Sequence, residues 1–297
     1  MIASNEKNKI YKQVLRPVIF LDLFSFPATA WELWHYLDKE VSLLEIENTL
    51  SELEEQKVIK KMQGFYFLSG REDIVNIRRQ RYNHSSSKLR KARVFSRLFS
   101  LFPGVIMVAA ANFIGSHNWR QESDIDFFII TKENYIWRSR LFCAGVAKIL
   151  FSRPTRKNKK DKICLSFYVS ESALNLKTLE LDGGDPYFEY WRRDLFPLYA
   201  YKGIWNKFQV ANDNYKKEQV FDKKNSNENI RSKLGLFEIV AKKIQLLILP
   251  LNLSRAAIYS EGVVINDQVL KLYIKEKRRY FRQSFNKKKY EIFKTLN

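Results

Sequence analysis

The sequence predicts an α+β protein, in which a group of β-strands in the middle of the chain has helices before and after it. Three observations favour this class. Residues 1–70 show helical apolar spacing that ends in a hairpin signal, and residues 103–185 contain three apolar runs suited to strands. From residue 186 onward the pattern is mainly helical. With 297 residues, 45% of them hydrophobic, the chain can form two domains and a sizeable core.

Residues 1–70 are predicted to form three helices and a β-hairpin. The expected elements cover residues 10–23, 30–38, 43–56 and 57–68. Thr29 and Ser42 precede the second and third helices as N-caps, and Gln63-Gly64 marks the hairpin turn. This order is typical of a winged helix. Because the third helix carries five glutamates and no basic residue before Lys57, we expect it to pack or to dock a partner rather than to neutralise DNA phosphates.

Residues 71–102 are predicted to form a strongly basic helical connector. It is either one long helix or two helices that break near the serines at 85–87. The whole chain has a formal net charge of +20. Such a charge favours anionic partners such as nucleic acid, nucleotide phosphates or acidic lipid, although a lysine-rich composition also serves plain solubility.

Two aspartates, Asp124 and Asp126, begin the second of the three apolar strands, a position that aspartate normally avoids. The strands are expected at 105–111, 124–131 and 162–170, with a helix at about 135–150. Side chains two residues apart on a strand point to the same face, with backbones about 6.6 Å apart. Two carboxylates placed in this way can converge on one Mg²⁺ or bracket two ions.

The order of strand, Gly/Ser turn, Ser-Asp-Ile-Asp and strand resembles the nucleotidyltransferase domain of the DNA polymerase beta superfamily. The matching segments are "NFIGS" at 112–116 and "SDID" at 123–126. The whole chain also resembles bacterial proteins that place a winged helix before such a domain. The resemblance implies a mixed sheet in residues 103–185, with Asp124 and Asp126 as catalytic residues that hold Mg²⁺. It also implies a nucleoside triphosphate donor, most commonly ATP, whose nucleotidyl group passes to an acceptor hydroxyl while pyrophosphate leaves.

The turn departs from the family's pattern. Asn112 and Phe113 stand where the family has Gly-Ser, and Gly115 and Ser116 follow three residues later. Asparagine tolerates positive φ, so Asn112 is predicted to replace the glycine. The missing serine hydroxyl is expected from Ser116 or Ser123. We therefore assign nucleotide binding to Asn112, Gly115, Ser116 and Ser123.

Many family members carry a third carboxylate on the later strand, and here the middle of that strand holds Cys164 instead. The nearest acids are Asp161 before the strand and Glu171 after it. We assign the third catalytic position to Glu171. Loss of the third acid leaves open a slow enzyme, a base from elsewhere, or a non-catalytic nucleotide- or nucleic-acid-binding regulatory protein that keeps the fold.

Residues 186–297 are predicted to be helical and to end in a basic tail. The charge favours RNA or another polyanion as the acceptor, and the amphipathic stretch at 236–249 could also lie on an anionic membrane. A duplex-binding repressor is a further alternative, which the acidic third helix disfavours. Cys143 and Cys164 lie in apolar stretches without metal-ligand spacing. We identify no secretory signal and no transmembrane segment, and expect a cytoplasmic protein.

Overall fold

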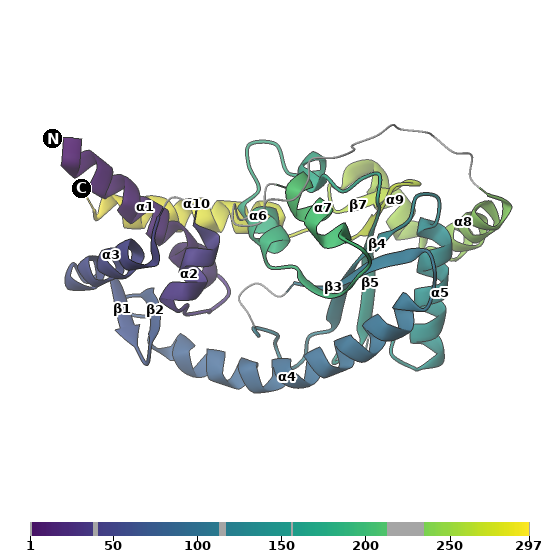
Figure 1. Ribbon diagram of the computed structural model, residues 1–297, viewed down its shortest axis with the longest axis horizontal. Coiled ribbons are helices and arrows are strands. Elements are labelled where there is room, and N and C mark those ends of the chain that lie inside the picture. The colour runs from purple at the N-terminus through teal and green to yellow at the C-terminus, as the bar shows by residue number, and fades with distance from the viewer. Residues whose placement is uncertain (1, 38–40, 113–116, 156, 213–234, 297) are drawn as a thin grey trace.

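A computed structural model describes residues 2–37, 41–112, 117–155, 157–212 and 235–296 (Figure 1). The N-terminal body consists of α1 (Ile2–Asp22), α2 (Ala30–Tyr36), α3 (Leu43–Glu55), β1 (Ile59–Met62) and β2 (Phe65–Leu68). A long helix, α4 (Asp73–Ser100), runs from this body to a second body built around a sheet. The protein is therefore α+β, as the sequence predicts.

The predicted caps and hairpin of the N-terminal body are confirmed. Thr29 and Ser42 each form a capping box. Each side chain accepts a hydrogen bond from the backbone N–H of the glutamate three residues later, and the carboxylate of that glutamate accepts from the backbone N–H of the cap residue. Gln63 and Gly64 both have positive φ, as a two-residue hairpin turn requires. The first helix begins about two turns earlier than predicted, since no residue between 2 and 10 stops it.

α4 is one continuous helix, which settles the alternative left open at the serines. Ser85 is buried, and its hydroxyl accepts a hydrogen bond from the backbone N–H of Trp119 at 3.0 Å. A serine that would weaken an isolated helix is thus used to hold a neighbouring loop.

The sheet has six strands in the order β6-β3-β4-β5-β8-β7. They are β3 (Val105–Ala111), β4 (Ile125–Thr131), β5 (Ile163–Ser170), β6 (Phe196–Ala200), β7 (Val263–Ile265) and β8 (Val269–Leu272). β4 and β5 are parallel, and every other neighbouring pair is antiparallel. The sheet is therefore mixed. Its two central strands are β4, which begins directly after Asp124 and contains Asp126, and β5, which contains Cys164.

Residues 186–297 contain helices, as the prediction of a helical region expects, but they also supply three of the six strands, which the prediction missed. β6 contains Pro197, a residue that is confined to edge strands and that weakens a strand signal. β7 and β8 have only three and four residues, too few to show a period. The sheet thus extends beyond residue 185, where we expected the middle region to end.

Helices cover both faces of the sheet. They are α5 (Ile136–Ile149), α6 (Pro186–Arg193), α7 (Ile204–Ala211), α8 (Leu236–Ile248), α9 (Leu251–Tyr259) and α10 (Arg278–Lys294), with a short 3₁₀ turn at Leu176–Leu179. Phe127 of β4 faces the core shared with α4 and α5, and its neighbour Phe128 faces the core shared with α6 and α7. Gly104 allows α5 to approach β3, because a Cβ there would lie 2.5 Å from the ring of Tyr135.

The last helix joins the two bodies. Phe285 of α10 is buried in the N-terminal core, with its ring 5.8 Å from that of Phe20. Buried Asp22 at the end of α1 pairs with Lys288 of α10 and, at 2.9 Å, with Arg71. α10 therefore acts as a second connection, on the opposite side from α4 (Figure 1).

Among the described residues, no helix combines the length and the apolar character needed to cross a bilayer.

Replacing Phe285 by alanine should lower the free energy of unfolding by about 3–5 kcal/mol, because a fully packed aromatic ring is lost. Phe285 is 2% exposed. Tyr290→Ala on the same helix is the matched control, since Tyr290 is 71% exposed and should cost less than about 0.5 kcal/mol. Urea titration followed by circular dichroism measures both. Equal stabilities for the two variants would contradict the docking of α10.

Candidate functional site

Asp124 and Asp126 lie at the start of β4, in the middle of the sheet. Asp126 is opposite Ala111 at the end of antiparallel β3 and opposite Cys164 near the start of parallel β5. Both carboxylates thus sit where β3 ends and where β4 and β5 begin. Ile125, between them, is fully buried in the core.

The two carboxylates and the thiol of Cys164 form one cluster, with all ligand atoms within 4.8 Å of one another. This confirms that the two aspartates converge on one side of the strand. Carboxylate oxygens are the ligands that Mg²⁺ prefers, whereas a thiol suits softer metals. Asp124 is half-buried and Asp126 is buried, so the cluster lies partly below the protein surface at this end of the strands.

Burial and the neighbouring charge of Asp124 raise the pKa of Asp126 to about 6. Hydrogen bonds from Asn112 and Cys164 and the charge of Lys159 act in the opposite direction. The pKa of the Cys164 thiol is raised well above its ordinary value, first by burial and then by the two carboxylates. The thiol is therefore protonated, and a cation bound between the carboxylates would relieve the repulsion.

Asn112 connects the cluster to α6. Its side chain hydrogen-bonds Asp126, and its Oδ1 accepts from the hydroxyl of Tyr187 at 3.1 Å. The φ of Asn112 is +53°, the left-handed conformation that we predicted for an asparagine in the glycine's place. The backbone turn and the side chain of this residue thus both position Asp126.

Tyr273, directly after β8, was not singled out by the sequence. Its hydroxyl oxygen is buried and has no hydrogen-bond partner among the residues that the structure describes. Its pKa is raised first by burial and then by the neighbouring acidic groups, Asp126 foremost, so it lies near the cluster. A buried hydroxyl without a partner costs free energy, which makes Tyr273 an unsatisfied polar group on this side of the sheet.

α4 anchors the loop that leads into the cluster. Lys88 is buried, donates to the carbonyl of Ser123 at 2.5 Å and pairs with Asp161 at 2.8 Å. Seven residues before Lys88 on the same helix, the guanidinium of Arg81 donates to the side chain of Asn118 at 2.8 Å. These two cations of the basic connector thus have their partners within the protein.

The assignment of Glu171 as third catalytic acid is wrong. Because β4 and β5 are parallel, Glu171 at the end of β5 lies beside Thr131, at the opposite end of the strands from Asp126. The strand rise places it about 15–20 Å from Asp126. Its carboxylate accepts from the backbone of Glu133. The register of the two strands was the missing signal.

The structure describes only some of the residues to which we assigned nucleotide binding. Gly115 and Ser116 lie outside the described residues. The hydroxyl of Ser123 donates to the carbonyl of Arg120 at 2.9 Å, which closes the turn before the aspartates. Nucleotide binding by Asn112 and Ser123 stays a prediction.

Comparisons with protein-family models, with curated proteins and with solved structures found no match.

Asp126→Asn should stabilise the metal-free protein at pH 7.5 by about 1–3 kcal/mol. The raised pKa means that the proton of Asp126 stabilises the folded state below about pH 4 and that this stabilisation is lost as pH rises through about 6. Asparagine removes the charge at neutral pH. Thermal unfolding in a chelator at pH 4.5 and 7.5 measures the gain, which should be much smaller at the lower pH. Glu171→Gln is the control, and an equal gain there would contradict the cause given.

Proposed function

We propose that this protein is a Mg²⁺-dependent nucleotidyltransferase, with Asp124 and Asp126 as the metal ligands. The carrying observation is the convergence of the two carboxylates at the start of a central strand, beside the end of an antiparallel strand and the start of a parallel one. This matches what the sequence resemblance implies for the Asp-x-Asp of a polymerase-beta-type domain.

The residues of the cluster fit a magnesium ion. Two carboxylates supply hard oxygen ligands, and the pKa of Asp126 is raised first by burial and then by repulsion from Asp124, which a cation would cancel. Cys164 keeps its proton and is a neighbour rather than a ligand. When bound, Mg²⁺ would hold the triphosphate oxygens and favour departure of pyrophosphate.

The chain's own residues then orient the cluster. Asn112 holds Asp126 by its side chain, and Tyr187 fixes Asn112. Lys88 pins the carbonyl before Asp124. Such a rigid arrangement is what a site based on positioning requires.

The N-terminal body supports a winged-helix arrangement, since three helices precede a two-stranded hairpin. Its third helix, α3, presents exposed glutamates such as Glu47 and Glu55. We propose that this body docks a partner and does not read duplex DNA. An RNA or another polyanionic acceptor would find its countercharge elsewhere on a chain of net charge +20.

A second function, a nucleotide- or nucleic-acid-binding regulator without catalysis, is favoured by one observation. Cys164 occupies the position on β5 next to Asp126, and no third carboxylate of the described chain joins the cluster. Such a descendant would bind nucleotide and Mg²⁺ without turnover.

Titration with labelled ATP and the other nucleoside triphosphates should show binding in Mg²⁺ and at least tenfold weaker binding in a chelator. The Asp124→Asn/Asp126→Asn variant should lose the Mg²⁺-dependent part, because both ligands are gone. Glu171→Gln is the matched control, since it removes a carboxylate at the far end of the same strands.

Three results separate the two functions. Mg²⁺-dependent binding with pyrophosphate release on addition of RNA supports the enzyme. Binding without release over a panel of acceptors supports the regulator. Absence of nucleotide binding in the folded wild type would reject the enzyme and leave only a regulator that binds nucleic acid.

Cys164→Asp should strengthen Mg²⁺ binding by about tenfold, because it places a third carboxylate beside Asp126. In a chelator the same variant should be less stable than the wild type, since three negative charges then repel one another. Isothermal titration with Mg²⁺ measures the affinity. Cys164→Ser is the control, because it changes the same position without adding a carboxylate. The other cysteine, Cys143, is unsuitable because it lies in the core. Equal affinities for the aspartate and serine variants would contradict the geometry.

A further inference from the structure

The helix α8 (Leu236–Ile248) buries polar side chains and exposes apolar ones. Its polar residues Glu238 and Gln245 are buried, whereas Phe237, Leu247 and Ile248 are 75%, 86% and 72% exposed. A surface helix of a soluble protein normally buries the apolar stripe and exposes the polar one.

Specific bonds fix this orientation. Glu238 accepts from the backbone N–H of Trp137 at 2.7 Å and from the guanidinium of Arg138 at 3.0 Å, at the start of α5. Gln245 donates to the carbonyl of Trp137 at 2.5 Å and accepts from Arg140. The polar face of α8 is thus committed to α5, and the apolar face has to point outward.

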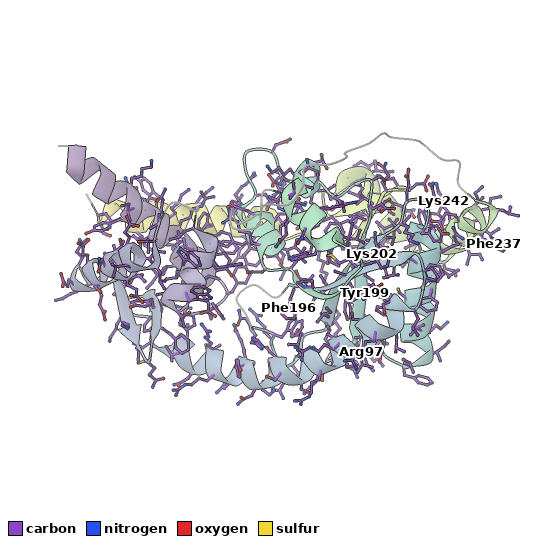
Figure 2. The ribbon with its side chains drawn as sticks, viewed as in Figure 1. Arg97, Phe196, Tyr199, Lys202, Phe237 and Lys242 are labelled. Carbon is purple, nitrogen blue, oxygen red and sulfur yellow. The ribbon has the colours of Figure 1, made fainter. Side chains whose placement is uncertain are left out.

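The outward residues form one surface with α5, which we call the α5–α8 apolar surface and define by Ile149, Phe237, Val240, Ile244, Leu247 and Ile248. Val240, Ile244 and Leu247 follow one another at helical spacing, and Phe237, Ile244 and Ile248 form the adjacent row. A groove of about 500 Å³ runs between the two helices. Figure 2 shows Phe237 at the end of the molecule, away from the N-terminal body.

Exposed apolar side chains are concentrated in this part of the chain. More than half of the large apolar side chains that lie exposed in the described part of the chain come from α8, α9 and the C-terminal half of α5 with the residues just after it. Contiguous exposed apolar surface of this kind marks an interaction site.

The charges around the surface have one sign. Residues 141–160 and 239–260 contain no Asp or Glu. The same segments carry the exposed cations Lys148, Lys243 and Arg255. An apolar face with a cationic rim is complementary to a bilayer that exposes negative headgroups.

We propose that the α5–α8 apolar surface binds the surface of an anionic lipid bilayer, with α8 lying in the interface. α8 has 13 residues, about 20 Å of helix, which suits a helix that lies in the interface rather than one that spans it. The apolar rows enter the boundary between headgroups and acyl chains, and Lys243 and Arg255 contact the headgroups.

A second copy of the chain is a poorer occupant. A two-fold interface places the same patch on both sides, so the cations of one rim would face those of the other. The segments that form the surface supply no exposed carboxylate to compensate them, because Glu238 is buried against α5. Negative lipid headgroups supply this countercharge.

Flotation of the full chain with vesicles tests the proposal. The vesicles consist of phosphatidylcholine alone or of phosphatidylcholine with phosphatidylglycerol at a ratio of about three to one. We expect at least tenfold tighter binding to the anionic vesicles, and a loss of at least tenfold in Phe237→Ser/Leu247→Ser. Lys243→Glu/Arg255→Glu should weaken binding to the anionic vesicles alone.

Leu44→Ser/Val94→Ser is the matched control, because both side chains are exposed but lie on α3 and α4. It should bind as the wild type does, and all variants should keep the wild-type unfolding temperature. Failure of the wild type to float with anionic vesicles would overturn the proposal, as would undiminished binding by Phe237→Ser/Leu247→Ser. If the wild type is a dimer and Phe237→Ser/Leu247→Ser is a monomer, the proposal is also overturned and the surface is assigned to a second copy. None of these outcomes depends on nucleotide binding.

Discussion

The parallel pairing of β4 with β5 is the constraint on which the rest of the site depends. It places Asp126 next to Cys164 and separates both from Glu171 by the length of the strands. A parallel pair requires a crossover, and α5 supplies it across one face of the sheet. The antiparallel partner β3 then ends at the same edge, so Asn112, directly after β3, lies beside the carboxylates and hydrogen-bonds Asp126.

Local signals in the sequence were sufficient for local structure. The caps at Thr29 and Ser42, the hairpin turn at Gln63 and the convergence of the aspartates each depend on residues within a few positions of one another. Glu171 was misplaced because its position depends on a register between strands almost forty residues apart. The strands after residue 186 were missed because tertiary pairing stabilises segments that are too short, or in β6 too proline-disturbed, to signal themselves.

Charge and hydropathy in this protein follow contacts rather than composition. Arg78 forms an ion pair with Glu32, and Lys88 is buried against Asp161, although both belong to the basic connector. α8 shows the converse, because its one carboxylate is internal and its leucines are external. Sequence periodicity gives the angle between the two faces of a helix, but only the bonds to its neighbours decide which face is outside.

The docking of α10 on the N-terminal core has a consequence for synthesis. Phe285 completes a core that otherwise comes from the first seventy residues and from Tyr190. On the ribosome, the N-terminal body emerges first but lacks this ring until α10 has been synthesised. Its final packing therefore waits for α10, and a chain truncated before α10 would have a first body with an open apolar face.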